Sequence, residues 1–208
     1  MTVYNDLDHI NRPSVAPFDM SLINPASVDL RLGNQLRRVH PVWSRLTVPD
    51  LRSLCDGHPL TFAAQRLLNV EERRLYVESG CAFDRIPLWG PVETFDTTWL
   101  MPGEFVLCSS LETVTVPDDA VALLFSKSST GRIGLEHLHA GIGDPGFVGT
   151  WTWELNNVAP WPLSLVAGKR LMQHIFIRLV GAPMRTYAET GRYQGQQGPT
   201  PACPPKDG

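Results

Sequence analysis

Seven consecutive residues, Ser126 to Arg132, concentrate the groups that bind phosphate. The segment SKSSTGR contains the cations Lys127 and Arg132, four hydroxyls and one glycine. A polyphosphate needs this combination of fixed positive charge, short hydrogen-bond donors and a backbone that a ligand can approach closely. The spacing differs from that of a Walker A loop. The segment therefore predicts a phosphate site, and the alternative is a solvated, serine-rich turn with a surface lysine.

Two acidic side chains further along are candidate site carboxylates. Asp144-Pro145-Gly146 has the residue order of a tight turn, which by itself would explain the composition. Across residues 150–156 apolar and polar residues alternate, so a strand would carry Glu154 on its polar face, among small polar side chains. If that face lines a cleft, partial desolvation makes Glu154 a usable general base. On an open face it would be an ordinary surface charge.

The histidines and cysteines do not predict a metal centre. His137 and His139 would share a face of a strand, but the sequence shows no third ligand beside them. Four cysteines are scattered without a C-x-x-C pair, and we expect them to be free thiols: Cys55, Cys81, Cys108 and Cys203. The H-x-E and P-C-x-x-C elements of zinc nucleobase deaminases are absent. We therefore expect no zinc.

The composition indicates one principal β-rich domain that positions these groups. The chain has 208 residues, with 17 glycines and 18 prolines, which favours short strands joined by tight turns. A net charge of −3 argues against binding of duplex nucleic acid. The sequence has no apolar run long enough to span a bilayer and no signal-peptide pattern at its start, so we expect a cytoplasmic protein without a membrane partner.

Hydrophobic periodicity divides the chain into four regions. Residues 1–20 are expected to be a loosely attached N-terminal arm, and residues 27–33 a half-buried strand that starts a β domain over 21–180. Residues 41–80 read as an insertion with one or two short helices, one of them within 62–76. Strands and turns resume from about residue 82, which predicts a sandwich or barrel. Residues 181–208 lack a core pattern and predict either disorder or a flap that orders on a ligand or neighbouring subunit.

Six segments in the same order carry a resemblance to a known family. They are 24–33 (NPASVDLRLG), 101–107 (MPGEFVL), 128–135 (SSTGRIGL), 140–149 (AGIGDPGFVG), 152–156 (TWELN) and 192–198 (RYQGQQG). Together they resemble the dCTP deaminase family, a branch of the trimeric dUTPase-like superfamily. One such motif would be weak, whereas six in register are specific.

The resemblance implies a mainly β subunit, a distorted β-barrel or jelly-roll, in a homotrimer with active sites between subunits. It implies zinc-independent, hydrolytic deamination of dCTP to dUTP, with Mg²⁺ carried by the triphosphate. Glu154 would be the catalytic glutamate that moves the proton, assisted by Arg132 and the Ser128 hydroxyl. The substrate-binding residues implied are Lys127, Ser128, Ser129, Arg132, Asp144, Thr152 and Trp153, with Tyr187, Arg192 and Gln196 from the C-terminal flap.

Departures from the family pattern leave other functions open. Lys127 stands where members usually have arginine, and Gly143 replaces an apolar residue before Asp-Pro-Gly, so the substrate could be a modified dCTP or a monophosphate. A first alternative is a bifunctional enzyme that also cleaves dUTP to dUMP, or a dUTPase-like pyrophosphatase, with Asp144 orienting the water. A second alternative is a non-catalytic, nucleotide-binding regulatory trimer, which the presence of Glu154 disfavours.

Overall fold

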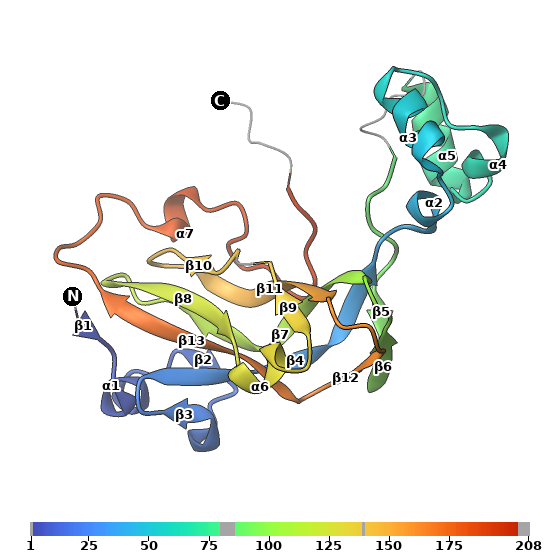
Figure 1. Ribbon diagram of the computed structural model, residues 1–208. Helices are drawn as coiled ribbons and strands as arrows, with labels where there is room; N and C mark the ends of the chain where they lie inside the picture. The colour runs from blue at the N-terminus through green and yellow to red at the C-terminus, as the bar shows by residue number, and fades with distance from the viewer. Residues whose placement is uncertain (1, 80–85, 139, 204–208) are drawn as a thin grey trace. The chain divides into compact units, whose positions relative to one another are not determined.

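The chain forms two compact units. The computed structural model describes residues 2–79, 86–138 and 140–203 (Figure 1). One unit, here called the β unit, comprises residues 1–36 and 92–208, and the other, the helical unit, comprises residues 37–91. Within the described ranges no helix is both long and apolar enough to cross a membrane.

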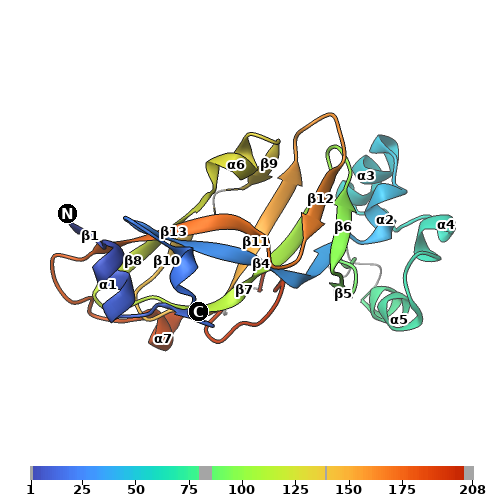
Figure 2. The same cartoon turned by 90° about the horizontal axis from the view of Figure 1, so that it is seen from below.

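The β unit is built on one curled, mainly antiparallel sheet (Figures 1 and 2). Its strands follow the order β10 (Ile142–Gly143), β8 (Ala120–Ser126), β13 (Arg170–Arg178), β4 (Ser27–Arg38), β7 (Phe105–Thr115), β11 (Val148–Asn157) and β9 (Leu135–His137). Four two-residue strands pair at its margins: β1 (Thr2–Val3), β2 (Val15–Ala16), β3 (Ile23–Asn24) and β5 (Glu93–Thr94). Strands β6 (Thr97–Leu100) and β12 (Leu163–Val166) form a separate pair. The prediction of a mainly β fold is confirmed.

Alternating side chains give the β unit its core. In β4, Val28, Leu30 and Leu32 are fully buried, and in β11, Trp153 and Leu155 are fully buried. These are the apolar positions of the two alternating patterns, because successive side chains of a strand point to opposite faces. Burying one large aliphatic or aromatic side chain contributes about 1.5–3 kcal/mol, so this face fixes the register of both strands.

The N-terminal residues belong to the core of the β unit, so the expectation of a loosely attached arm is wrong. Strand β1 pairs with β13, and the Tyr4 main-chain N–H donates to the Phe176 carbonyl at 3.0 Å. Helix α1 (Asp6–Asn11) begins at a capping box formed by Asn5 and is followed by the short helix η1 (Met20–Leu22). Tyr4 is 2% exposed and packs edge-on against Phe176. The polar composition of this segment gave no indication that Tyr4 is a buried core residue.

The helical unit contains more helices than the sequence predicted. Within its described residues the structure has α2 (Pro41–Ser44), α3 (Val48–Cys55), α4 (Phe62–Gln65) and α5 (Val70–Glu78). The expected single helix over 62–76 is two helices, because Asn69 caps α5 with Glu72 in a capping box. Pro49 lies in the first turn of α3, where proline is tolerated. A small core of its own holds the unit together: Val42, Leu54, Leu60, Ala64, Leu68, Tyr76 and Ile86.

The C-terminal segment packs on its own chain. After α7 (Tyr187–Thr190) the chain runs beside the start of β11, where the Gly195 N–H donates to the Val148 carbonyl at 2.7 Å. The two tyrosines of the segment, Tyr187 and Tyr193, pack against the core of the β unit while remaining partly exposed. Up to residue 203 the segment therefore has contacts with the β unit of its own chain.

Candidate functional site

The predicted phosphate segment forms a short helical turn beside β13. Helix α6 (Ser128–Gly131) follows Lys127, whose main-chain N–H donates to the Leu171 carbonyl at 3.0 Å. The Thr130 hydroxyl donates to the same carbonyl at 2.8 Å. These bonds leave the side chains of Ser128, Ser129 and Arg132 exposed. The segment thus presents hydroxyls and a guanidinium to solvent from a fixed backbone.

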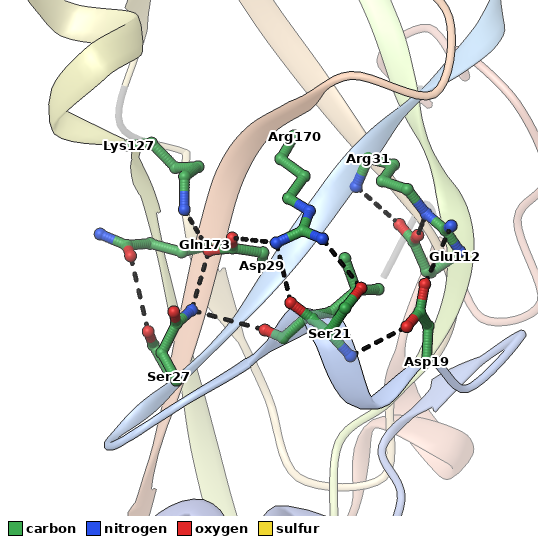
Figure 3. A network of polar contacts seen from close by, with 11 residues as sticks. Asp19, Ser21, Ser27, Asp29, Arg31, Glu112, Lys127, Arg170 and Gln173 are labelled. Atoms are coloured by element: carbon green, nitrogen blue, oxygen red, sulfur yellow. Dashed lines mark hydrogen bonds and ion pairs between the residues drawn. The ribbon is translucent and has the colours of Figure 1, made fainter.

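Lys127 is held by a carboxylate that sequence reasoning missed (Figure 3). Its Nζ pairs with Oδ1 of Asp29 at 2.5 Å, and Asp29 is 2% exposed. Asn24 donates to the same oxygen at 2.9 Å, and the Arg170 guanidinium lies 3.7 Å from Oδ2. The alternation of residues 27–33 placed Asp29 on the polar face of its strand. Lys127 and Arg170, from distant parts of the chain, meet Asp29 there.

Glu154 faces a buried histidine. Its Oε2 lies 3.1 Å from Nε2 of His137 on the adjacent strand β9. The Glu154 side chain is 26% exposed and that of His137 is 2% exposed. Although the two atoms are within ion-pair distance, neither has an aligned hydrogen-bond partner among the described residues. Both atoms are therefore buried polar groups whose hydrogen bonds the described residues do not satisfy.

His137 also connects Glu154 with the phosphate segment. It lines a hollow of about 400 Å³ together with Ser126, Gly131 and Gly134. A hollow of this size is within the range of small-molecule sites. His137 was singled out in the sequence as one of two potential metal ligands, but its partner in that pattern, His139, lies outside the described residues. No group of three or more potential metal ligands occurs in the described ranges.

The aspartate of the tight turn before β11 lies apart from this hollow. Asp144 accepts the Phe147 N–H at 3.1 Å through its carbonyl, and Gly146 has a φ of +86°, as the tight turn requires. Asp144 lines a second hollow, of about 520 Å³, with Arg185 and Tyr187. Thus Asp144 and Glu154 are brought to different places within one chain.

The side chain of Trp153 cannot contact a ligand in this chain. It is fully buried among the core residues of the β unit. Only its main chain remains for the substrate role that the resemblance implies. The neighbouring Thr152 has its hydroxyl on the other face, where it accepts the Thr200 N–H at 3.2 Å. The correction follows from the two-residue period of a strand, which puts adjacent residues on opposite faces.

Of the predicted flap residues, Gln196 and Tyr187 contact the β unit, whereas Arg192 is exposed to solvent. The Gln196 side chain donates to the Thr150 carbonyl at 2.7 Å, while its own carbonyl accepts the Thr150 N–H at 3.0 Å. Tyr187 packs edge-on against Phe147, with ring centroids 5.5 Å apart. Arg192 is exposed. Gln196 thus occupies the main-chain groups at the open edge of β11.

The comparisons with known proteins agree with the fold and name the family. The chain superposes on the crystal structure of 2′-deoxycytidine 5′-triphosphate deaminase from Agrobacterium tumefaciens with a TM-score of 0.54, at 21% identity, covering 84% of this chain and 47% of that one. The two chains therefore share a fold over the superposed part. A family model described as dCTP deaminase-like matches residues 5–179. The chain belongs to the dCTP deaminase-like family.

Two relatives that match most of the chain have the same name. A dCTP deaminase, dUMP-forming, from Beutenbergia cavernae is 38% identical over 91% of this chain and 85% of its own. A protein of the same name from Nocardioides is 35% identical over 92% of this chain and 86% of its own.

Proposed function

We propose that this protein hydrolyses dCTP to dUMP, releasing ammonia and pyrophosphate. Family membership supports deamination, and the name shared by the relatives supports dUMP as the product in place of the dUTP expected from the sequence motifs. The bifunctional alternative of the sequence analysis thereby becomes the leading hypothesis. Two bonds must be cleaved, C4–N of the cytosine and the anhydride between the α and β phosphates, and each cleavage consumes one water.

The observation that supports the deamination step is the placement of Glu154 against His137, where Oε2 and Nε2 lie 3.1 Å apart and neither has an aligned hydrogen bond among the described residues. Cytosine C4 is a poor electrophile, so a base must take a proton from water during attack and an acid must return one to the ring or to the departing amine. Glu154 is placed to do both in turn, because its Oε2 is buried without an aligned partner and its side chain remains partly exposed. His137 would limit the rotamers of the carboxylate and so keep it oriented.

We assign binding of the triphosphate to the segment that follows β8. Lys127 and Arg132 would bind the triphosphate through charge-assisted hydrogen bonds, with the hydroxyls of Ser128 and Ser129 as further donors. Asp144 would orient the second water. Because Asp144 lies in a different hollow from His137 of the same chain, a complete site requires a neighbouring copy, as the family homotrimer would provide. The homotrimer and a cytoplasmic location remain predictions.

Magnesium would enter with the nucleotide and offset the charge of its phosphates. The carboxylate nearest to the phosphate segment, Asp29, is already paired with Lys127. The described residues therefore offer no prepared ligand set for a resident ion. Closing of the residues 187–200 over the nucleotide would exclude water and strengthen these contacts.

Product analysis tests the proposal. Incubation with dCTP and Mg²⁺ should release ammonia and pyrophosphate in equal amounts, with dUMP as the nucleotide product. Pyrophosphate without ammonia would refute deamination, and accumulation of dUTP would refute the dUMP-forming assignment. Glu154→Gln should abolish ammonia release while nucleotide binding stays within about tenfold of wild type. Glu71→Gln, which alters an exposed glutamate of α5 that does not line the hollow at His137, is the control and should retain turnover.

A further inference from the structure

The buried carboxylate of Asp29 joins three elements of the β unit beside the phosphate segment. Asp29 lies on β4, Lys127 precedes α6, and Arg170 begins β13 (Figure 3). The contacts to Asp29 come from Lys127 Nζ, from the Arg170 guanidinium at 3.7 Å and from Asn24 Nδ2 at 2.9 Å. One anion therefore faces two cations and an amide.

Two cations share the carboxylate of Asp29. The neighbouring guanidinium of Arg31 is already neutralised, since its Nε lies 2.6 Å from the buried carboxylate of Glu112 and its Nη1 lies 3.5 Å from Asp19. Lys127 and Arg170 share Asp29 alone among the described carboxylates within ion-pair distance. The six charges of the network balance, but the two cations beside the phosphate segment share one carboxylate, which leaves them able to pair with an anionic ligand.

Both cations reach solvent from fixed positions. The Lys127 side chain is 23% exposed and that of Arg170 is 42% exposed, whereas that of Asp29 is 3% exposed. Arg170 is further held by Ser21, through a bond to its carbonyl and another to its hydroxyl, each of 2.8 Å. A free lysine or arginine loses up to about 2 kcal/mol of rotamer entropy when a ligand immobilises it. Here the fold has already imposed most of that restriction.

We propose that Asp29 is a positioning residue, which holds Lys127 and Arg170 as a preorganised cation pair for the polyphosphate of the nucleotide. The proposal rests on the proposed function and adds Arg170 to its binding residues. Lys127 keeps its charge but lacks the bidentate fork of the arginine that the family resemblance leads one to expect. A buried anchor and a second cation compensate for that loss.

Steady-state kinetics with Asp29→Asn test the proposal. The amide keeps the shape of the side chain but removes the charge, so KM for dCTP should rise about tenfold while kcat changes less than about twofold. Asp56→Asn removes an exposed carboxylate of the helical unit, outside this network, and it should leave KM unchanged. An unchanged KM in Asp29→Asn, or an equal loss in kcat, would overturn the proposal.

A double-mutant cycle separates positioning from a general loss of structure. If Asp29 acts through Lys127, then Lys127→Gln should raise KM less in the Asp29→Asn background than in the wild type, whereas additive effects would contradict the coupling. Asn24→Ala, which removes one donor to Asp29, should raise KM by a smaller factor and serves if Asp29→Asn does not fold.

Binding of inorganic tripolyphosphate distinguishes failure of this proposal from failure of the proposed function. Calorimetry should show weaker binding to Asp29→Asn than to wild type, whether or not the wild type deaminates dCTP. A wild type that releases no ammonia would refute the function alone. Equal tripolyphosphate affinity of the wild type and Asp29→Asn would refute the positioning role alone.

Discussion

Mild acid should destabilise the β unit through His174. This imidazole is fully buried in β13, stacked on Phe176 with ring centroids 4.7 Å apart, and neither ring nitrogen has a partner among the described residues. Burial, with a smaller effect from nearby His9, lowers the pKa of His174 to about 3. The ordinary pKa of an unfolded histidine is about 6.5. Below that value the unfolded chain binds a proton that the folded chain excludes, so stability falls as the pH falls.

The magnitude follows from linkage. Between about pH 7.5 and pH 5 the unfolded His174 becomes protonated while the folded one stays neutral, which removes about 2 kcal/mol of unfolding free energy. Because the folded residue stays neutral throughout this range, the loss is set by the pKa of the unfolded histidine. His9 adds in the same direction, since burial lowers its pKa against the raising effects of Asp8 and Asp6.

Urea denaturation at the two pH values measures the effect. His174→Leu should lose about 2 kcal/mol less than wild type on acidification, and at about pH 7.5 it should be no less stable, because it removes two unpaired nitrogens. Phe176→Leu is the control, since it opens a cavity beside His174 without removing an ionisable group and should keep the wild-type pH dependence. A His174→Leu variant with the full wild-type acid sensitivity would refute the reasoning.

Three further substitutions test separate parts of the structure. Gly149→Ala should speed hydrogen exchange of residues 194–198, because a Cβ at position 149 would lie 3.0 Å from the Gln196 carbonyl oxygen. Unchanged exchange would show that these residues do not pack against β11. Glu112→Gln should cost about 3 kcal/mol in urea denaturation, since Glu112 is fully buried against Arg31; a loss below about 1 kcal/mol would contradict this. Tyr76→Phe should destabilise the helical unit by about 1–2 kcal/mol, measured by hydrogen exchange, because its hydroxyl accepts a buried N–H at 2.7 Å. Exchange rates in the helical unit that equal those of the wild type would contradict this.

The β unit was predictable wherever a strand is buried on one face. The alternation of apolar and polar residues in β4 and β11 is enough to identify their core residues, because the period of two is a property of the strand itself. The helical unit was predicted less well, since its short helices begin at caps such as Thr47 and Asn69, which hydrophobic periodicity does not register. Tyr4 was missed because one anchor in a polar segment leaves no periodic signal.

The candidate site was likewise predictable in part from the sequence. Local composition identified the segment from Lys127 to Arg132 and the carboxylate of Glu154, because chemistry that depends on residue type is written in short motifs. The partners of these residues were not predictable: Asp29 lies 98 residues from Lys127 along the chain, and His137 meets Glu154 only because β9 pairs with β11.

The sequence by itself determined which residues carry charge, which faces of the strands are apolar and to which family the motifs point. Tertiary structure alone decided that Asp29 is buried between two cations, that His137 faces Glu154 and that the indole of Trp153 lies in the core. The physical reason is that burial and ion pairing depend on groups brought together by sheet pairing over long separations in the chain, which local periodicity does not encode.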